Sequence, residues 1–232
     1  MFLLDNRHHI YYYIGWLAKQ RRSIFKNVIL INMPRELPPR QRTETDMNHY
    51  KMTIAGLERA LPLCPITDDL YIGAFVTFGD PELVTACAEE LLKRAPEFDY
   101  MLTAESKGIP ITHEMARLAG NKRYFLARKT PKLYMTGVFE VDVRSITTAK
   151  AQKLYLDKAE ADMIRGKRIL IVDDVVSTGE SEAALEKLVT AAGGEICGRM
   201  CILAEGEAAE RDDLIYLEKL PLFNKNGDVI ED

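Results

Sequence analysis

Two adjacent carboxylates followed by a small, hydroxylated turn are the residues best suited to chemistry. Asp173 and Asp174 come directly after the apolar residues 169–172, and Ser177, Thr178 and Ser181 follow them. Backbone N–H groups in a turn that opens a helix can bind a phosphate. Carboxylates instead accept hydrogen bonds from sugar hydroxyls or bind Mg²⁺. The pattern therefore predicts a phosphorylated sugar, with its hydroxyls at the acids and its phosphate in the turn.

Three other interpretations of this segment were weighed. A core strand that ends in a solvated acidic turn is the simplest, but it leaves the Thr-Gly turn and the start of a helix unexplained. A P-loop is excluded because no Lys follows Gly179. A response-regulator receiver is excluded because too little chain follows the acids to complete such a domain.

A second candidate anion site lies at residues 103–110, with the sequence TAESKGIP. It follows a short apolar run and precedes a predicted helix, and Lys107 places a cation beside it. Taken alone, an ordinary strand-to-helix turn with a solvated Lys explains these residues equally well.

A basic cluster follows a third apolar run. Arg128, Lys129 and Lys132 lie within the sequence ARKTPK. A solvated basic loop is the plain interpretation, and stabilisation of negative charge on a leaving group is the functional one.

The pattern of apolar residues predicts the elements that position these groups. Helices are expected at 81–94, 110–118 and 181–192. Strands are expected at 100–104, 123–127, 137–143, 168–172, 196–204 and 214–217. Strands that alternate with helices indicate an α/β fold with a mostly parallel sheet and right-handed crossovers.

Composition limits the class of protein. The 232-residue chain carries a formal net charge of −4, so it lacks the excess of positive charge that is typical of nucleic-acid-binding proteins, and no nucleic-acid partner is expected. No apolar run is long enough to span a bilayer, and no cleavable signal is recognised, so no membrane partner is expected. The four cysteines have no zinc-type spacing and are expected to be free thiols, which favours a cytoplasmic location.

The first 46 residues differ from the rest of the chain. They are aromatic and basic, and a Pro- and Arg-rich stretch at 34–42 resembles a linker. We expect an N-terminal extension of unknown role at 1–46: a structural element, an arm for a partner or membrane surface, or sequence upstream of the functional start.

The acidic motif resembles the phosphoribosyl-pyrophosphate (PRPP) motif of type I phosphoribosyltransferases, and the chain is most similar to the adenine and xanthine group. The resemblance covers residues from about 50 to the C-terminus and implies the type I fold at 47–232, with a small hood at about 62–80 and a mobile flap at about 128–150. It implies that PRPP ribose and 5-phosphate bind at Asp173, Asp174, Val175, Val176, Ser177, Thr178, Gly179, Glu180 and Ser181. Many members have Gly where this chain has Glu180, so that side chain is expected to point to solvent.

The resemblance also assigns the two other sites. Pyrophosphate is expected at Ala104, Glu105, Ser106, Lys107, Gly108, Arg128, Lys129 and Lys132, with a cis non-proline peptide near residues 105–107. The catalytic groups are expected to be Asp173, Asp174, Arg128 and Lys132, and residues 143–148 resemble a xanthine-enzyme flap. The base is expected against Phe75, Val76 and Thr77, although Phe75 and Phe78 fit a core position equally well.

The implied reaction joins a purine to PRPP and releases pyrophosphate in purine salvage. Mg²⁺ is the expected cofactor, bound through PRPP oxygens without a dedicated protein site. Adenine is the first expectation for the base, because xanthine enzymes carry a Lys where this chain has Glu205 and Gly206. Xanthine or another oxo-purine, another base, and a non-catalytic PRPP-sensing regulator stay open. The resemblance further implies a homodimer.

Overall fold

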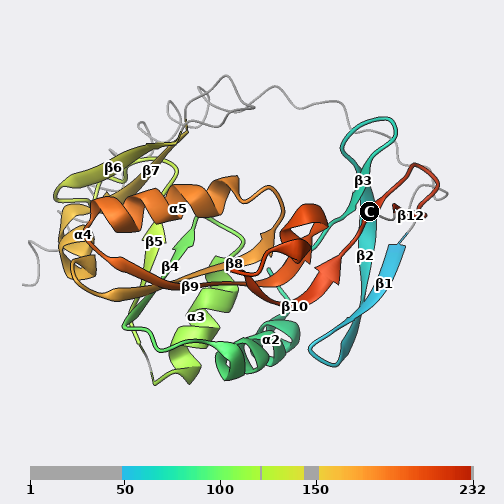
Figure 1. The fold of residues 1–232 in the computed structure, drawn as a ribbon, viewed down its shortest axis with the longest axis horizontal. Helices are drawn as coiled ribbons and strands as arrows, with labels where there is room; N and C mark the ends of the chain where they lie inside the picture. Colours follow the sequence, from blue (N-terminus) through green and yellow to red (C-terminus); the bar gives the residue numbers. More distant parts are fainter. Residues whose placement is uncertain (1–48, 121, 144–151, 231–232) are drawn as a thin grey trace, which may run out of the picture. The chain divides into compact units, whose positions relative to one another are not determined.

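The computed structural model describes residues 49–120, 122–143 and 152–230 (Figure 1). The chain separates into two units, Met1–Asp46 and Met47–Asp232. The expectations for the N-terminal extension therefore lie outside the described residues. The second unit contains all three predicted anion-binding segments.

The centre of the second unit is a five-stranded sheet in the order β10-β9-β8-β4-β5. Every neighbouring pair in it is parallel, as the alternation of strands and helices predicts. The strands are β4 (Tyr100–Ala104), β5 (Tyr124–Ala127), β8 (Arg168–Val176), β9 (Glu195–Glu205) and β10 (Ile215–Leu220).

Helices cover both faces of this sheet, as the side-chain contacts of β8 show. Leu170 and Val172 pack in one core cluster with residues of α2 (Pro81–Arg94) and α3 (Ile109–Leu118). Ile169 and Ile171 pack in another with residues of α5 (Glu180–Ala191). In Figure 1, α5 lies on one side of the sheet, and α2 and α3 on the other. A strand buried on both faces needs an apolar run, which residues 169–172 supply.

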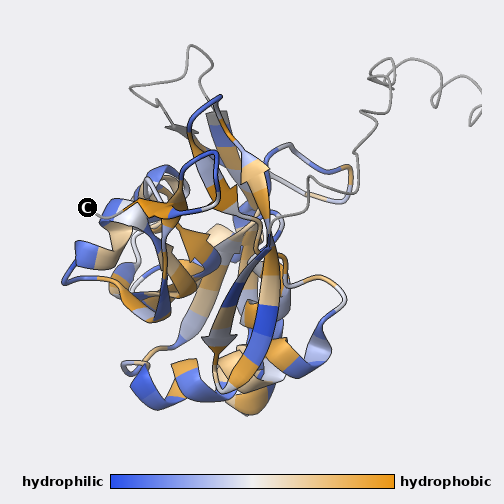
Figure 2. Cartoon of the chain, turned by 90° about the vertical axis from the view of Figure 1, so that its right-hand side faces the viewer, coloured by the Kyte–Doolittle hydropathy of each residue, from blue (hydrophilic) through white to orange (hydrophobic). Residues whose placement is uncertain are grey.

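The helices begin where the sequence predicts. Asp80 caps α2 by accepting a hydrogen bond from the Leu83 N–H at 3.1 Å, and Pro81 occupies the first turn. Hydrophilic and hydrophobic residues alternate along the helices, which bury their apolar faces (Figure 2).

A second sheet, which is antiparallel and includes part of the range expected for the hood, has the order β1-β2-β3-β11-β12. Its strands are β1 (His49–Ile54), β2 (Leu57–Pro65), β3 (Tyr71–Gly73), β11 (Leu222–Phe223) and β12 (Val229–Ile230). Ala55 and Gly56, with φ of 47° and 80°, form the two-residue turn that joins β1 to β2. This sheet extends beyond the expected range of 62–80 at both ends and recruits two strands from the C-terminal part of the chain.

A hairpin of β6 (Val138–Val143) and β7 (Gln152–Asp157) follows β5 and precedes α4 (Lys158–Ile164). The strand expected at 137–143 is present, and β7 and α4 were not predicted. Residues 144–151, which include most of the segment compared with a xanthine-enzyme flap, lie outside the described residues.

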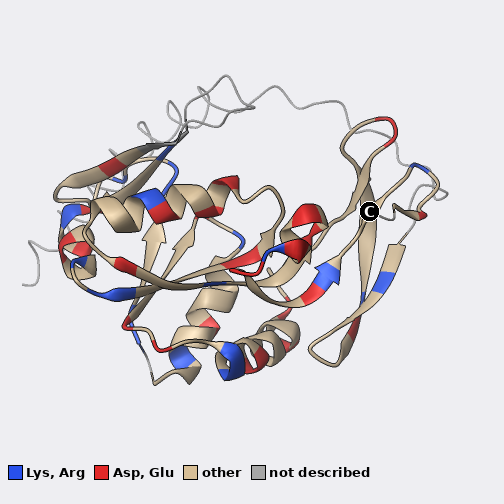
Figure 3. Ribbon diagram, viewed as in Figure 1, with Lys and Arg blue, Asp and Glu red and all other residues tan. Residues whose placement is uncertain are grey.

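The remaining sequence expectations concern charge, thiols and membranes. In α2 the acidic residues precede the basic residues of the last turn, and in α5 the acidic residues precede Lys187 (Figure 3). All four cysteines are free, with Cys87 and Cys201 buried. Within the part of the chain that the structure describes, no helix combines the length and hydrophobicity needed to cross a bilayer.

Candidate active site

The paired carboxylates lie within β8, which continues to Val176 because its last residues still pair with β9. Asp174 is only 3% exposed. Among the described residues its Oδ2 has no hydrogen-bond partner, and Lys107 Nζ lies 3.5 Å away. Asp173 Oδ1 accepts the backbone N–H of Asp174 at 2.9 Å. An acceptor that is buried without a donor is suited to a ligand hydroxyl.

The environment of Asp173 shifts its ionisation. Burial, together with the negative charge of Asp174, raises the pKa of Asp173 to about 8. The Lys107 ammonium opposes this rise but does not cancel it. Asp173 therefore favours its protonated form near neutral pH, in which its carboxyl group can donate a hydrogen bond as well as accept one.

The predicted phosphate cradle connects β8 to α5. Gly179 adopts a φ of +73°, which a residue with a side chain rarely adopts, and its carbonyl accepts the first helical hydrogen bond, from Ala183. Ser177, Thr178 and Ser181 are exposed, so their hydroxyls are accessible. Glu180 is exposed as well, as expected for a side chain that must avoid a phosphate. Val175 and Val176 pair with β9 and lead the chain into this turn.

The loop from Ala104 to Gly108 joins β4 to α3 beside these acids. The Glu105–Ser106 peptide is cis, within the predicted interval. Gly108 lies so close to β8 that a Cβ there would be 2.6 Å from Asp173 Oδ1. The same Cβ would be 2.4 Å from Thr103 Oγ1, which has no hydrogen-bond partner among the described residues. The two predicted anion sites are thus adjacent, although about seventy residues separate them in sequence.

The basic cluster is gathered around one carboxylate of that loop. Glu105 Oε1 lies 3.0 Å from Arg128 Nη1 and 3.5 Å from Lys132 Nζ. Glu105 Oε2 accepts the backbone N–H of Lys129 at 3.2 Å. Burial acts to raise the pKa of Glu105, but these three contacts outweigh it and lower that pKa. Glu105 therefore holds the cations that are expected to bind pyrophosphate next to residues 104–108, because its carboxylate pairs with them.

The predicted base-binding residues separate into different environments. Phe75 is 4% exposed and packs in the core cluster beside α2, which matches the core alternative for its ring. Val76 and Phe78 are each about half exposed. Thr77 is buried, and its hydroxyl donates to the Lys107 carbonyl at 2.9 Å. Thr77 therefore anchors this segment to the loop between Ala104 and Gly108.

The end of β9 lies next to the cradle. Val176 pairs with Ala204, so Glu205 follows at the same edge of the sheet. Burial raises the pKa of Glu205, and the positive charge of Lys107 counteracts this rise. Glu205 is thus a partly buried acid within electrostatic reach of Lys107.

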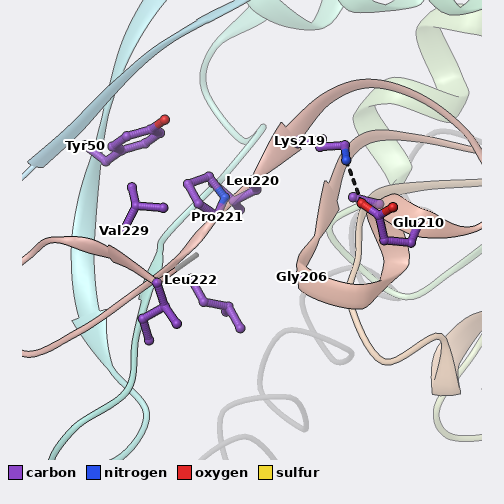
Figure 4. A pocket seen from close by; sticks show the side chains of 10 residues that line it. Tyr50, Gly206, Glu210, Lys219, Leu220, Pro221, Leu222 and Val229 are labelled. Atoms are coloured by element: carbon purple, nitrogen blue, oxygen red, sulfur yellow. Dashed lines mark hydrogen bonds and ion pairs between the residues drawn. The ribbon is translucent and has the colours of Figure 1, made fainter. Parts of the chain in front are cut away.

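A separate pocket lies between the antiparallel sheet and the connection from β9 to β10 (Figure 4). It has a cavity volume of about 330 Å³. Tyr50, Leu222 and Val229 line it from that sheet, and an ion pair between Lys219 and Glu210 lies on its other side. None of its lining residues belongs to the three anion-binding segments.

Some residues around the site have no local sequence signal. Arg211, from the connection between β9 and β10, lies against the cradle, where a Cβ at Gly179 would be 3.2 Å from its Nη1. Tyr134 lies with its ring centroid 6.0 Å from the Arg128 guanidinium carbon. Only the folded chain brings these side chains to the predicted motifs.

Known proteins share this sequence pattern. Residues 82–226 match the model of the phosphoribosyl transferase domain. A xanthine phosphoribosyltransferase from Exiguobacterium is 31% identical over 63% of this chain and 76% of its own length. A hypoxanthine/guanine phosphoribosyltransferase from Methanotorris igneus is 32% identical over 65% of this chain and 83% of its own length.

Solved structures share the fold. Adenine phosphoribosyltransferase from Rhodothermus marinus aligns with a TM-score of 0.53 at 21% identity, over 74% of this chain and 94% of that one. The Thermoanaerobacter pseudethanolicus enzyme aligns with a TM-score of 0.52 at 23% identity, over 60% of this chain and 82% of that one. The expected type I fold is confirmed, and the chain belongs to the phosphoribosyltransferase family.

Proposed function

We propose that this chain is a purine phosphoribosyltransferase, which transfers the phosphoribosyl group of PRPP to a purine and releases pyrophosphate. One observation carries the proposal: Gly108 places the pyrophosphate loop directly against Asp173, beside the buried Asp174. A phosphoribosyl group with an adjoining pyrophosphate needs such neighbouring sites. The names of the sequence relatives support a purine as acceptor.

Each part of the site has a defined task in this proposal. Asp173 and Asp174 accept hydrogen bonds from the ribose hydroxyls, and the turn at residues 177–181 binds the 5-phosphate. Lys107, Arg128 and Lys132 stabilise the charge that develops on pyrophosphate as the bond to C1 breaks. A purine nitrogen attacks C1, so no covalent protein nucleophile is needed. Catalysis is then mainly positioning and electrostatic stabilisation.

Mg²⁺ is the cofactor that this chemistry implies, and the residues fit it. The carboxylate oxygens of Asp173 and Asp174 are hard donors that suit Mg²⁺ or its bound waters. The Asp174 Oδ2 atom, which has no hydrogen-bond partner among the described residues, gives such a group a place to interact. When bound through PRPP oxygens, Mg²⁺ would neutralise part of the pyrophosphate charge.

Two candidates stand for the base. Adenine is favoured because the positions that follow β9 hold Glu205 and Gly206, with no Lys to meet a base oxygen. An oxo-purine is favoured by the names of the relatives, which are xanthine and hypoxanthine/guanine enzymes. A half-buried acid such as Glu205 suits a base that presents an N–H donor, and because adenine, guanine, hypoxanthine and xanthine all do so, it does not choose between the two candidates.

The proposal is tested by pyrophosphate release from PRPP and Mg²⁺, with adenine, xanthine, hypoxanthine, guanine and orotate offered separately. Release with one purine supports the proposal and identifies the base. PRPP binding without release would instead favour the non-catalytic sensor. Gel retardation of DNA that weakens with salt would support the regulator further. The homodimer remains a prediction from the resemblance, and the cytoplasmic location remains a prediction from the cysteines.

A further inference from the structure

We propose that Arg211 is a positioning residue for 5-phosphate binding, which it serves by neutralising the buried Glu182 and supporting the turn at Gly179. The inference rests on the proposed function, since it assigns a task within the same PRPP site. Nothing in the motifs predicts it, because Arg211 comes from the connection between β9 and β10.

Glu182 creates the need for such a residue. It lies in the first turn of α5, three residues after Gly179, and is only 4% exposed. A buried carboxylate is costly unless it is paired. Here it also lies next to the amides that must attract a phosphate, so an uncompensated charge would repel the ligand. Burial indeed raises the pKa of Glu182, and Arg211 counteracts this rise.

The side chain of Arg211 both neutralises Glu182 and supports the turn at Gly179. Its Nη1 donates to Glu182 Oε2 at 2.6 Å, and its Nε and Nη2 donate to Asp213 at 2.9 Å each. The bonds to Asp213 fix the guanidinium plane, and Nη1 lies 3.2 Å from a Cβ position at Gly179. Because each guanidinium nitrogen already donates to a carboxylate, we assign Arg211 a role that acts through the turn and Glu182.

Arg199 completes the arrangement from β9. Its Nε lies 3.5 Å from Glu182 Oε1 and also forms ion pairs with Glu186 and Asp213. Two arginines thus hold one buried acid at the start of α5. Because Arg211 is the one that touches the turn, its removal should disturb the phosphate site most.

The test measures the two halves of PRPP separately, by calorimetric titration with ribose 5-phosphate and with Mg²⁺-pyrophosphate. Arg211→Met should raise the dissociation constant for ribose 5-phosphate at least about tenfold and change that for pyrophosphate less than about twofold. Arg211→Lys should lie between Met and wild type. Arg117→Met, which breaks an ion pair with Glu114 on α3, is the matched control and should change neither constant.

A double variant separates charge neutralisation from general damage. Glu182→Gln/Arg211→Met removes the buried acid together with its partner, so it should bind ribose 5-phosphate more tightly than Arg211→Met alone. If Arg211→Met does not fold, Arg211→Lys carries the test and should weaken ribose 5-phosphate binding while that of pyrophosphate is unchanged. Unchanged ribose 5-phosphate binding in Arg211→Met, or equal loss of both ligands, would overturn the inference alone. A wild-type chain that binds neither ligand would overturn the proposed function with it.

Discussion

Gly108 and Asp173 are in such close approach that the loop after β4 has no room for a side chain at this position. A Cβ at Gly108 would lie 2.6 Å from Asp173 Oδ1 and 3.1 Å from Asp173 Cα. The second of these atoms is backbone and cannot rotate away. The contact therefore fixes the loop at residues 104–108 relative to Asp173 and Asp174, the two segments that the proposal assigns to pyrophosphate and ribose.

Gly108→Ala should separate the two half-sites. We expect a loss of about 1–3 kcal/mol in the free energy of unfolding, the usual cost of overpacking, and PRPP binding weakened at least about tenfold. Chemical denaturation and PRPP titration measure the two effects. Gly198→Ala is the matched control, because its Cβ would be 2.9 Å from the Pro96 ring and 3.1 Å from the buried Leu170 side chain, away from the anion-binding segments. It should lose stability while the folded protein keeps its PRPP affinity, and equal PRPP affinity in both variants would contradict the role of the Gly108 contact.

Asp173→Asn should stabilise the protein at alkaline pH. The pKa of Asp173 is raised to about 8, whereas an unfolded Asp titrates near about 4. Between these values the folded state holds more protons than the unfolded state, so this group makes stability fall as pH rises. Asn removes that penalty, and we expect a gain of about 1–3 kcal/mol at pH 8 and little change at pH 4.

Urea denaturation of both proteins at pH 4, 6 and 8 measures this effect. The variant should also bind PRPP poorly, because the buried acid that destabilises the free protein is also proposed to bind the ribose hydroxyls. A stability difference that does not depend on pH would show that Asp173 ionises normally in the folded chain.

Lys132→Ala should reduce turnover more than base binding. Lys132 Nζ lies 3.5 Å from Glu105 Oε1, and Glu105 belongs to the loop that is expected to bind pyrophosphate. We expect kcat to fall about 10- to 100-fold, because the lost cation stabilises the departing pyrophosphate, with the KM for the base changed less than about threefold. Steady-state kinetics with saturating PRPP separates the two. Lys158→Ala, which removes an exposed ion pair with Asp162 on α4, is the control, and similar turnover in both variants would leave Lys132 without this role.

Local sequence signals explain which parts could be predicted. Residues 169–172, the acids, and the helix start at Pro81 each carry their own pattern of apolar residues, caps or turns, and they lie where expected. The strand end was misjudged: β8 runs to Val176 because β9 is there to pair with it. The sequence predicts a strand end before the polar Asp173, because the pattern of apolar residues does not show which strand pairs with β8.

Long-range pairing explains what the sequence does not reveal. β11 contains only Leu222 and Phe223, and it becomes a strand because β3, far away in the chain, pairs with it. In the same way, Glu182 and Arg211 resemble ordinary surface charges in the sequence. Only the fold shows that the acid is buried and that the arginine lies next to the phosphate turn.

The measurement that tests the central claim most directly is calorimetric titration of PRPP, with Mg²⁺, into wild-type protein and Asp174→Asn. Asp174 is buried, and its Oδ2 has no hydrogen-bond partner within residues 49–120, 122–143 and 152–230. The substitution should therefore leave the fold intact while it removes an acceptor from the ribose site. The account predicts measurable PRPP binding by the wild type and none by a folded Asp174→Asn variant. Equal PRPP affinity in the two proteins would contradict the assignment of Asp173 and Asp174 to the phosphoribosyl group.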